Sequence, residues 1–137
     1  MKNTFKNLFF VSLFIAIGIT SALSQNAKYT TLAPKEFKAQ QAKDNGFLMD
    51  LRTPEQYMTG NIKRSKLCNI NDQSFESILD MMEKANPVYV YDQDGKNSVR
   101  AAEMMVKRGY TKIYILDGGF DAWKKAGIES ATMNGGK

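Results

Sequence analysis

The 137-residue chain has very little cysteine: Cys68 is the single one, so no disulfide can form within the chain. Its 19 Lys and Arg against 14 Asp and Glu give a net charge of +5, and the basic residues are dispersed along the chain without forming a run. That pattern does not indicate a nucleic-acid-binding surface. Internal repeats and low-complexity segments are absent too. A hydrophobic content of 43% with 24% charged residues is typical of a globular protein, and the length favours one domain.

The longest apolar run, Leu8 to Thr20, lies near the N-terminus and carries no charge. Two Lys precede it, and small residues such as Ala22 and Ser24 follow, which is typical of a secretory signal peptide. The run is short for a membrane span, which needs roughly 20 residues; an uncleaved anchor is the alternative. No Cys lies near the cleavage site, so a lipoprotein is not indicated. We expect export to the periplasm or the extracellular space, and no membrane association after cleavage.

The expected domain organisation follows from this signal. It consists of a signal peptide at residues 1–24, one domain at residues 25–130 and a flexible tail at residues 131–137.

Short apolar segments alternate with segments of helical pattern along the rest of the chain. The predicted strands are KYTTL, GFLMDL, KLCNI, VYVYD and KIYIL, and the predicted helices lie in APKEFKAQQA, TPEQYMTG, DQSFESILDMMEKANP, SVRAAEMMVKRG and GGFDAWKKAG. This order predicts an α/β fold with a largely parallel sheet covered by helices on both faces. Ligand sites of such folds lie outside the carboxyl ends of the strands, and the loop after VYVY is one such end.

Two of the helices have a predicted buried face. In the third helix, which Pro87 is expected to end, the apolar positions at helical spacing are Phe75, Ile78, Leu79 and Met82. In the fourth, which is expected to end at Gly109, they are Val99, Ala102, Met105 and Val106.

The loop after VYVY determines what chemistry is available. A loop that leads into a helix N-terminus directs several backbone N–H groups at one point, and the helix dipole adds positive potential there. A Cys at the strand end would become a strong nucleophile, and a nearby Arg would bind an anionic substrate through paired hydrogen bonds. The loop has neither, because Asp92 stands at the strand end and Asn97 where the loop meets the helix.

Three segments resemble, in order, the motifs of the rhodanese-like domain family. LMDLRTPEQYMTGNI resembles the family's Asp-x-Arg…Glu-x-Tyr-x-x-Gly-His-Ile segment, VYVYDQDGKNSVRAA its Cys-x-x-Gly-x-Arg-Ser loop, and YILDGGFDAW its closing Gly-Gly…Trp. The resemblance extends from about Ala33 to Gly127. It implies a five-stranded parallel sheet with helices on both faces, and the transfer of sulfane sulfur through a persulfide on the loop Cys.

When the family's motif residues are matched to this sequence one by one, the scaffold positions agree and the reactive positions differ. The matching structural positions are Asp50, Arg52, Glu55, Tyr57, Gly60, Gly95, Ser98, Gly118, Gly119 and Trp123. Asp92 takes the position of the Cys, Asn97 that of the loop Arg, and Asn61 that of the His. The loop has the six-residue length of sulfur-transferring members. Those six residues run from Asp92 to Asn97, and together with the Ser98 that follows them the active-site-like loop consists of Asp92, Gln93, Asp94, Gly95, Lys96, Asn97 and Ser98.

An Asp at the reactive position predicts a domain without sulfurtransferase activity, because a carboxylate cannot form a persulfide and repels an anionic donor. We expect Asp92 to accept N–H groups from Gly95 through Ser98, and we expect no catalytic residue, metal or cofactor. The predicted function is a binding or regulatory module whose partner, a protein or a small anionic ligand, lies at the 92–98 loop. Weak transfer of sulfur from thiosulfate is the alternative. Lys96 and Arg100 flank the loop and either bind such an anion or are merely solvated.

Other interpretations of the same residues are weaker. VYVYDQDGK also resembles the first motif of haloacid-dehalogenase-type phosphatases, which use an Asp and Mg²⁺, but too little sequence follows to supply their later motifs. A calcium loop from Asp92 to Glu103 would have its Gly fourth instead of sixth. We expect Cys68 to be an inert core residue, and Arg52 to form a structural ion pair with Asp50 or Glu55.

Overall fold

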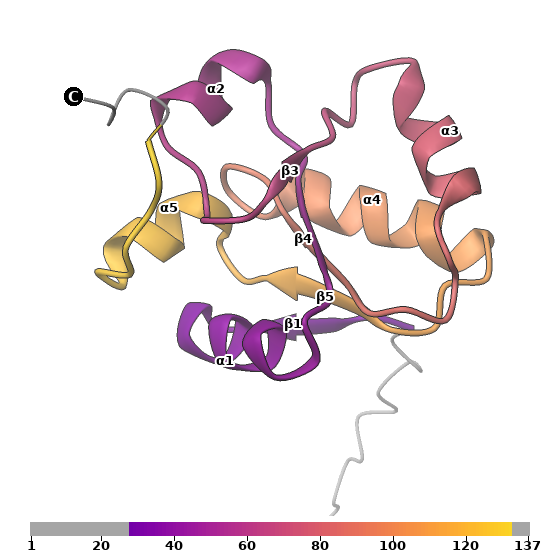
Figure 1. Ribbon diagram of the computed structural model, residues 1–137, viewed down its shortest axis with the longest axis horizontal. Coiled ribbons are helices and arrows are strands. Elements are labelled where there is room, and N and C mark those ends of the chain that lie inside the picture. The colour runs from indigo at the N-terminus through magenta and orange to yellow at the C-terminus, as the bar shows by residue number, and fades with distance from the viewer. Residues whose placement is uncertain (1–27, 133–137) are drawn as a thin grey trace, which may run out of the picture.

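The computed structural model describes residues 28–132 (Figure 1), so the predicted signal peptide and residues 133–137 of the predicted tail lie outside the described residues. Five parallel strands form one sheet in the order β1-β5-β4-β2-β3, which confirms the predicted fold. The elements are β1 (Thr30–Leu32), α1 (Pro34–Asp44), β2 (Phe47–Asp50), α2 (Pro54–Thr59), β3 (Lys66–Leu67), α3 (Ser74–Met81), β4 (Val88–Tyr91), α4 (Lys96–Lys107), β5 (Ile113–Leu116) and α5 (Gly119–Lys125).

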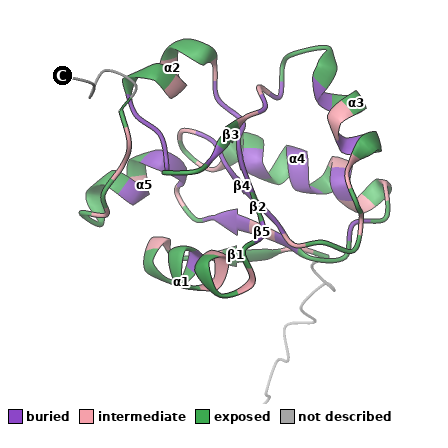
Figure 2. Cartoon of the chain, in the orientation of Figure 1, coloured by how far each residue is buried: buried purple, intermediate pink, exposed green. Residues whose placement is uncertain are grey.

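The sheet is covered on both faces, because successive strand residues point to opposite sides. The central strand β4 is buried along its whole length, and purple marks this buried centre in Figure 2. On one face Val88 and Val90 pack in a core with residues of α3 and α4, among them Leu79 and Met105. On the other face Tyr89 and Tyr91 share a core with α1 and α5, through Phe37, Phe120 and Trp123.

The third helix is shorter than the sequence predicts. It ends at Met81, and the prediction that it extends to Pro87 is wrong. The Lys84 ammonium donates to the carbonyls of Leu79 and Asp80 and so satisfies two groups that the last helical turn leaves free. Residues 83–86 then turn the chain into β4, with Asn86 N–H donating to the Glu83 carbonyl over 3.4 Å.

The buried face of α4 matches its prediction only in part. Ala102 and Met105 are buried as expected, but Val99 is 38% exposed, and Ser98 and Ala101 are buried instead. The helix lies close against the sheet at its start, where small side chains fit. The predicted face relied on the more apolar Val and therefore missed Ser98.

The first residue of the predicted tail, Ala131, is paired with another part of the domain. Ala131 pairs with Asn61 in an isolated antiparallel bridge, with N–H to O distances of 2.8 Å in both directions. Separately, none of the helices within residues 28–132 has the length and apolar character that crossing a membrane requires.

Candidate functional site

Asp92 lies between β4 and α4, at the carboxyl edge of the sheet, and is only 2% exposed. Its carboxylate accepts the N–H of Gly95 at 2.8 Å, the N–H of Asn97 at 2.9 Å and the Ser98 hydroxyl at 2.7 Å. Gly95 makes this turn possible with a φ of 98°. Asp92 therefore occupies the loop's own anion nest, but with fewer backbone donors than expected: the N–H groups of Gly95 and Asn97 donate to it, while the Lys96 N–H donates to Asp94 and Ser98 contributes its hydroxyl.

The start of α5 supports the loop from the neighbouring strand end. The Phe120 N–H donates to the Asp92 carbonyl at 2.8 Å, and the Asp121 N–H donates to the Gln93 carbonyl at 3.1 Å. Gly119 has a φ of 63°, and a Cβ there would lie 2.6 Å from the Asp92 carbonyl oxygen. The Gly118–Gly119 pair therefore brings the backbone of α5 against the backbone of the loop.

Arg52 joins the loop to the end of β2. Its guanidinium binds both oxygens of Asp50, with Nη2 at 2.7 Å from Oδ2 and Nε at 3.0 Å from Oδ1. Nη2 also donates to the Gly60 carbonyl at 2.7 Å, and Nη1 to Gln93 Oε1 at 3.1 Å. Burial acts to lower the pKa of Arg52, but the hydrogen bond and charge of Asp50 raise it overall. The predicted structural ion pair is thus the one with Asp50.

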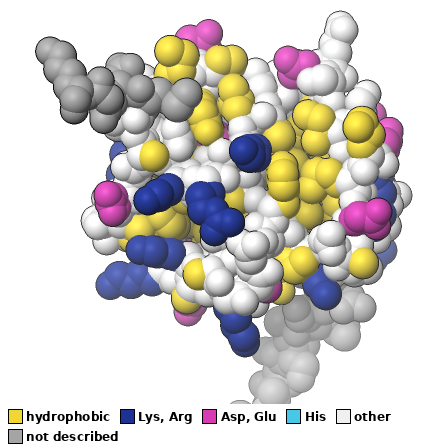
Figure 3. Space-filling model, viewed as in Figure 1, with side chains coloured by type: hydrophobic (Ala, Val, Ile, Leu, Met, Phe, Trp, Pro, Cys, Tyr) yellow, Lys and Arg dark blue, Asp and Glu magenta, His cyan; other side chains and the backbone are white. Residues whose placement is uncertain are grey.

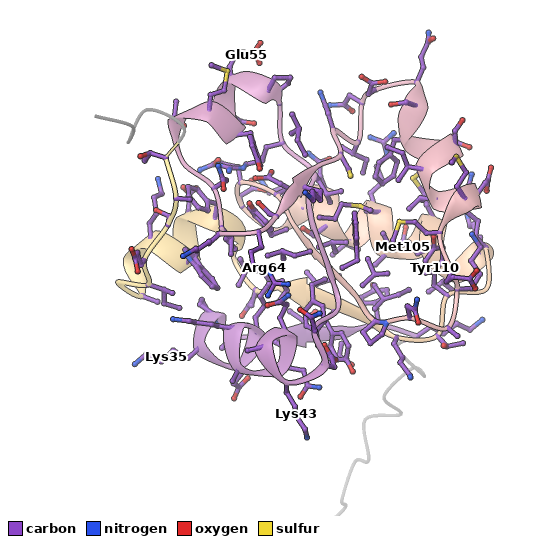
Figure 4. All side chains as sticks on the ribbon, viewed as in Figure 1. Lys35, Lys43, Glu55, Arg64, Met105 and Tyr110 are labelled. Atoms are coloured by element: carbon purple, nitrogen blue, oxygen red, sulfur yellow. The ribbon has the colours of Figure 1, made fainter. Side chains whose placement is uncertain are left out.

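Two of the predicted structural residues lie away from this constellation. Glu55 is exposed on α2, and Figure 4 shows it at the outer side of that helix. The pKa of Glu55 is lowered by hydrogen bonds from its own backbone N–H and from the Thr53 hydroxyl. Trp123 lies in the core between α5 and the sheet, so it positions α5 and does not reach the loop.

A cavity of about 210 Å³ opens in front of the loop and is rich in carboxamide side chains. These are Gln56, Asn69, Asn71, Gln93 and Asn97. Of these, Gln56, Asn69 and Asn71 were not predicted from the sequence. Their positions in the sequence could have indicated them, because Asn69 and Asn71 follow β3 and Gln56 follows β2. The carboxyl ends of these strands lie at the same edge of the sheet as the loop.

The carboxamides of this cavity present mainly donors. Gln56 Oε1 accepts the Thr53 N–H at 3.2 Å, Asn69 Oδ1 accepts the Asn71 N–H at 3.0 Å, and Asn71 Oδ1 accepts from Arg100 at 3.4 Å. The amide nitrogens of Gln56, Asn69 and Asn71 have no acceptor within residues 28–132. The cavity therefore offers N–H groups to a ligand that carries oxygen acceptors.

The charged residues beside the loop are exposed. Lys96 pairs with Asp94 at 3.3 Å, and the pKa of Asp94 is lowered, chiefly by the backbone N–H of Lys96. Within residues 28–132, no three His, Cys, Asp or Glu side chains are grouped so that they could hold a metal ion. In addition, α4 begins at Lys96, so the Asp92–Glu103 stretch is not a calcium-binding loop.

Cys68 has the environment of an unreactive thiol. It is buried in the core on the α3 and α4 side of the sheet, and its N–H donates to the Asp50 carbonyl at 2.8 Å. Desolvation, assisted by the nearby Asp50 charge, raises the pKa of the Cys68 thiol to about 11. Because the thiolate is the nucleophile, burial and the raised pKa disfavour a nucleophilic role for Cys68.

Comparison with known proteins gives matches over most of the chain. The family model of the rhodanese-like domain matches residues 33–126. The uncharacterised protein YqhL of Bacillus subtilis is 34% identical over 116 residues, which are 85% of this chain and 89% of that protein. The thiosulfate sulfurtransferase GlpE of Vibrio cholerae is 31% identical over 81 residues, 59% of this chain and 74% of the relative. The structure of a rhodanese-related protein from Thermoplasma volcanium matches with a TM-score of 0.65 at 20% identity, over 75% of this chain and 98% of that one.

Proposed function

The chain belongs to the rhodanese-like domain family, and we propose that within this family it is a binding or regulatory module without sulfurtransferase activity. The observation that carries the proposal is the buried Asp92 carboxylate, which accepts three hydrogen bonds at the position of the loop nucleophile. A carboxylate has no route to a persulfide. It also takes the N–H groups that would otherwise receive an anionic sulfur donor.

The charges around the cavity support a ligand other than a simple anion. Arg52 is buried and bound to Asp50, so it is not free to hold a substrate anion. Asp92 and Asp94 add negative charge at the cavity wall. The sequence suggested a protein or a small anionic ligand at this loop. The amide donors of Gln56, Asn69 and Asn71 favour a partner protein, or a neutral ligand rich in carbonyl or hydroxyl oxygens.

A sulfur-transfer assay with thiosulfate as donor and cyanide as acceptor tests the proposal. We expect no thiocyanate formation above that of a heat-denatured sample. Asp92→Asn is a matched control, because it removes the charge and still provides no sulfur nucleophile. Turnover by the unmodified chain that approaches that of a rhodanese with its loop Cys would disprove the proposal.

The double substitution Asp92→Cys with Asn97→Arg tests whether the surrounding scaffold is intact. The loop would then hold a thiol among backbone N–H groups at a helix N-terminus, which favours the thiolate. We expect sulfurtransferase activity to appear in the double variant and to be weaker in Asp92→Cys alone, since the Arg clamps the anionic donor. An inactive but folded double variant would mean that the loop has changed in shape as well as in residues.

Weak sulfur transfer is the second candidate function, and the similarity to a thiosulfate sulfurtransferase favours it. It would need a nucleophile, and Cys68 is the single thiol of the chain. Cys68→Ala separates the two candidates. Any genuine activity that depends on this thiol disappears in the variant, whereas a contaminating activity remains.

The pattern of the first 24 residues supports export of the domain to the periplasm or the extracellular space. Fractionation of cells that express the full chain with a C-terminal tag tests this part of the proposal. We expect the tagged protein in the exported fraction, shortened by the mass of the signal peptide.

A further inference from the structure

A second hollow lies on the face of the sheet that α1 and α5 cover. Its volume is about 330 Å³, which is within the range of small-molecule sites. Its apolar lining includes Phe37, Leu48, Ile62 and Trp123, each no more than 5% exposed. It shares no lining residue with the cavity at the 92–98 loop. The segment 129–131 forms one of its walls.

Basic side chains surround this apolar floor. Lys38 and Lys63 line the hollow, together with one acid, Glu129. A neighbouring hollow of about 370 Å³ shares Gln41 and Leu48 with the first and adds Arg64 and Lys66. We call the two hollows together the α1 groove. Figure 3 shows Lys and Arg side chains gathered over this part of the surface, and Figure 4 shows Arg64 in front of the sheet.

The cations of the α1 groove are not neutralised by the described part of the chain. None of Lys38, Lys63, Arg64 and Lys66 forms an ion pair with an acid within residues 28–132. Arg64 instead donates to the side-chain oxygen of Asn45 at 2.8 Å. With Glu129 as the one acid in its lining, the groove carries an excess of positive charge.

The shape and charge of the groove together define the ligand. The floor side chains are almost fully buried, so a membrane surface or a flat protein face would not reach them, whereas a slender apolar chain that enters the hollow would. A purely apolar ligand would leave the cations without a counterion, and a purely polar anion would gain nothing from the apolar lining of the hollow. We propose that the α1 groove binds a small amphipathic anion, with its apolar part against Ile62 and Trp123 and its acid group at Lys38 and Lys63.

Trp123 provides the reporter for a direct test, because it is the single Trp of the chain and lies in the floor of the groove. The probes are decanoate, butyrate and decyltrimethylammonium, each kept below the concentration at which it forms micelles. We expect a saturable change in Trp123 fluorescence with decanoate. Butyrate has the charge without the chain, and decyltrimethylammonium has the chain with the opposite charge, so both are expected to bind at least tenfold more weakly. Equal binding of decanoate and decyltrimethylammonium, or no binding of decanoate by fluorescence and by titration calorimetry, overturns the proposal.

Charge-reversal variants locate the site. The double substitution Lys38→Glu with Lys63→Glu is expected to weaken decanoate binding at least tenfold. Lys43→Glu is the matched control, since Lys43 is on the same helix, does not line the groove and points away from it in Figure 4. All three lysines are exposed, so the variants should keep the fold, which circular dichroism checks. Decanoate affinities that are equal in the double variant and the control overturn the proposal, whatever the outcome of the thiosulfate assay.

Discussion

At the scale of single residues, two aspartates of one loop illustrate how surroundings decide a role. Asp92 is buried and its two oxygens receive three donors, while Asp94 is exposed and pairs with Lys96. Oδ1 of Asp92 accepts both the Gly95 N–H and the Ser98 hydroxyl, and Oδ2 accepts the Asn97 N–H. Every donor points at an oxygen, so the site requires two acceptor atoms. A carboxylate meets this requirement, and a carboxamide of the same shape does not.

Asp92→Asn is therefore expected to destabilise the fold. The amide nitrogen would replace one oxygen and face an N–H or O–H donor, which leaves that buried donor unsatisfied. We expect the free energy of unfolding to fall by about 1–3 kcal/mol. Asp94→Asn is the matched control, and its exposed side chain should change stability by about 0.5 kcal/mol or less. Urea unfolding of both variants measures the difference, and equal stabilities would contradict this account of the loop.

Cys68 gives a prediction about pH. Its pKa is raised from 9.0 to about 11 by burial and by the Asp50 charge, so the folded state holds the thiol proton more tightly than the unfolded state does. The resulting stabilisation is complete below about pH 9 and is lost as the pH rises through 11. We expect iodoacetamide to modify Cys68 at pH 8 far more slowly in the native protein than in urea. Similar rates in the two conditions would show that the thiol is accessible.

At the scale of elements, the 92–98 loop leads into α4, but its backbone is held in place by the start of a different helix, α5. The α5 N-terminus donates two backbone N–H groups to the carbonyls of Asp92 and Gln93, at 2.8 and 3.1 Å. These are groups that the first turn of a helix cannot satisfy internally. The loop thus caps α5, and α5 fixes the loop. The close approach depends on Gly119, because a Cβ there would lie within 2.7 Å of three backbone atoms of residues 92–94.

Gly119→Ala tests this contact between elements. Gly127→Ala is the matched control, because Gly127 has a φ of 69°, similar to the 63° of Gly119, but a Cβ on Gly127 would meet no atom within 4 Å. Both variants place a residue with a Cβ in the left-handed region, which costs about 1–2 kcal/mol. Only Gly119→Ala also forces α5 away from the loop, so we expect it to be less stable than the control by about 1–3 kcal/mol. Thermal or urea unfolding makes the comparison. Equal losses would mean that α5 and the loop are not tightly coupled.

The sequence predicted the elements better than their ends and their side-chain partners. The buried runs VYVY and IYIL became β4 and β5, and the glycines and prolines bounded α2 correctly. The end of α3 was not predictable, since it depends on Lys84 reaching back to two carbonyls. Ser98 was placed in the loop by the sequence, but its burial was missed because that burial accompanies its bond to Asp92. Three carboxamide side chains of the cavity at the 92–98 loop were missed, because Gln56, Asn69 and Asn71 come together only through the order of strands in the sheet.

At the scale of the whole molecule, the two candidate sites depend on different parts of the chain. The cavity at the 92–98 loop is built at the carboxyl edge of the sheet by residues that follow β2, β3 and β4. The α1 groove is built by α1, β2, α5, the chain around the start of β3 and the segment that follows α5. That last segment is fixed at two points. The Trp123 indole N–H donates to the Glu129 carbonyl at 3.3 Å, and Ala131 pairs with Asn61.

A chain shortened after Gly127 tests what this C-terminal segment contributes. The truncation removes the partner of Asn61, the acceptor for Trp123 and the partly buried Ile128, which packs on the same core. We expect stability to fall by about 2–4 kcal/mol, from the lost hydrogen bonds and the lost apolar burial. Trp123 should also become more exposed to water, so its fluorescence maximum should move to longer wavelength.

The control for this truncation is a chain that ends at Thr132. It keeps every contact of the segment 128–132 and should match the full chain in stability and in the emission of Trp123. Decanoate binding should be lost in the chain that ends at Gly127, because the wall at residues 129–131 is gone, and kept in the control. The 92–98 loop takes no part in these contacts, so Asp92→Cys with Asn97→Arg should give the same sulfur-transfer activity per folded molecule in both backgrounds. If the chain that ends at Gly127 kept the Trp123 emission of the full chain, the segment would not cover the indole, and the assignment of residues 129–131 as a wall of the α1 groove would be wrong.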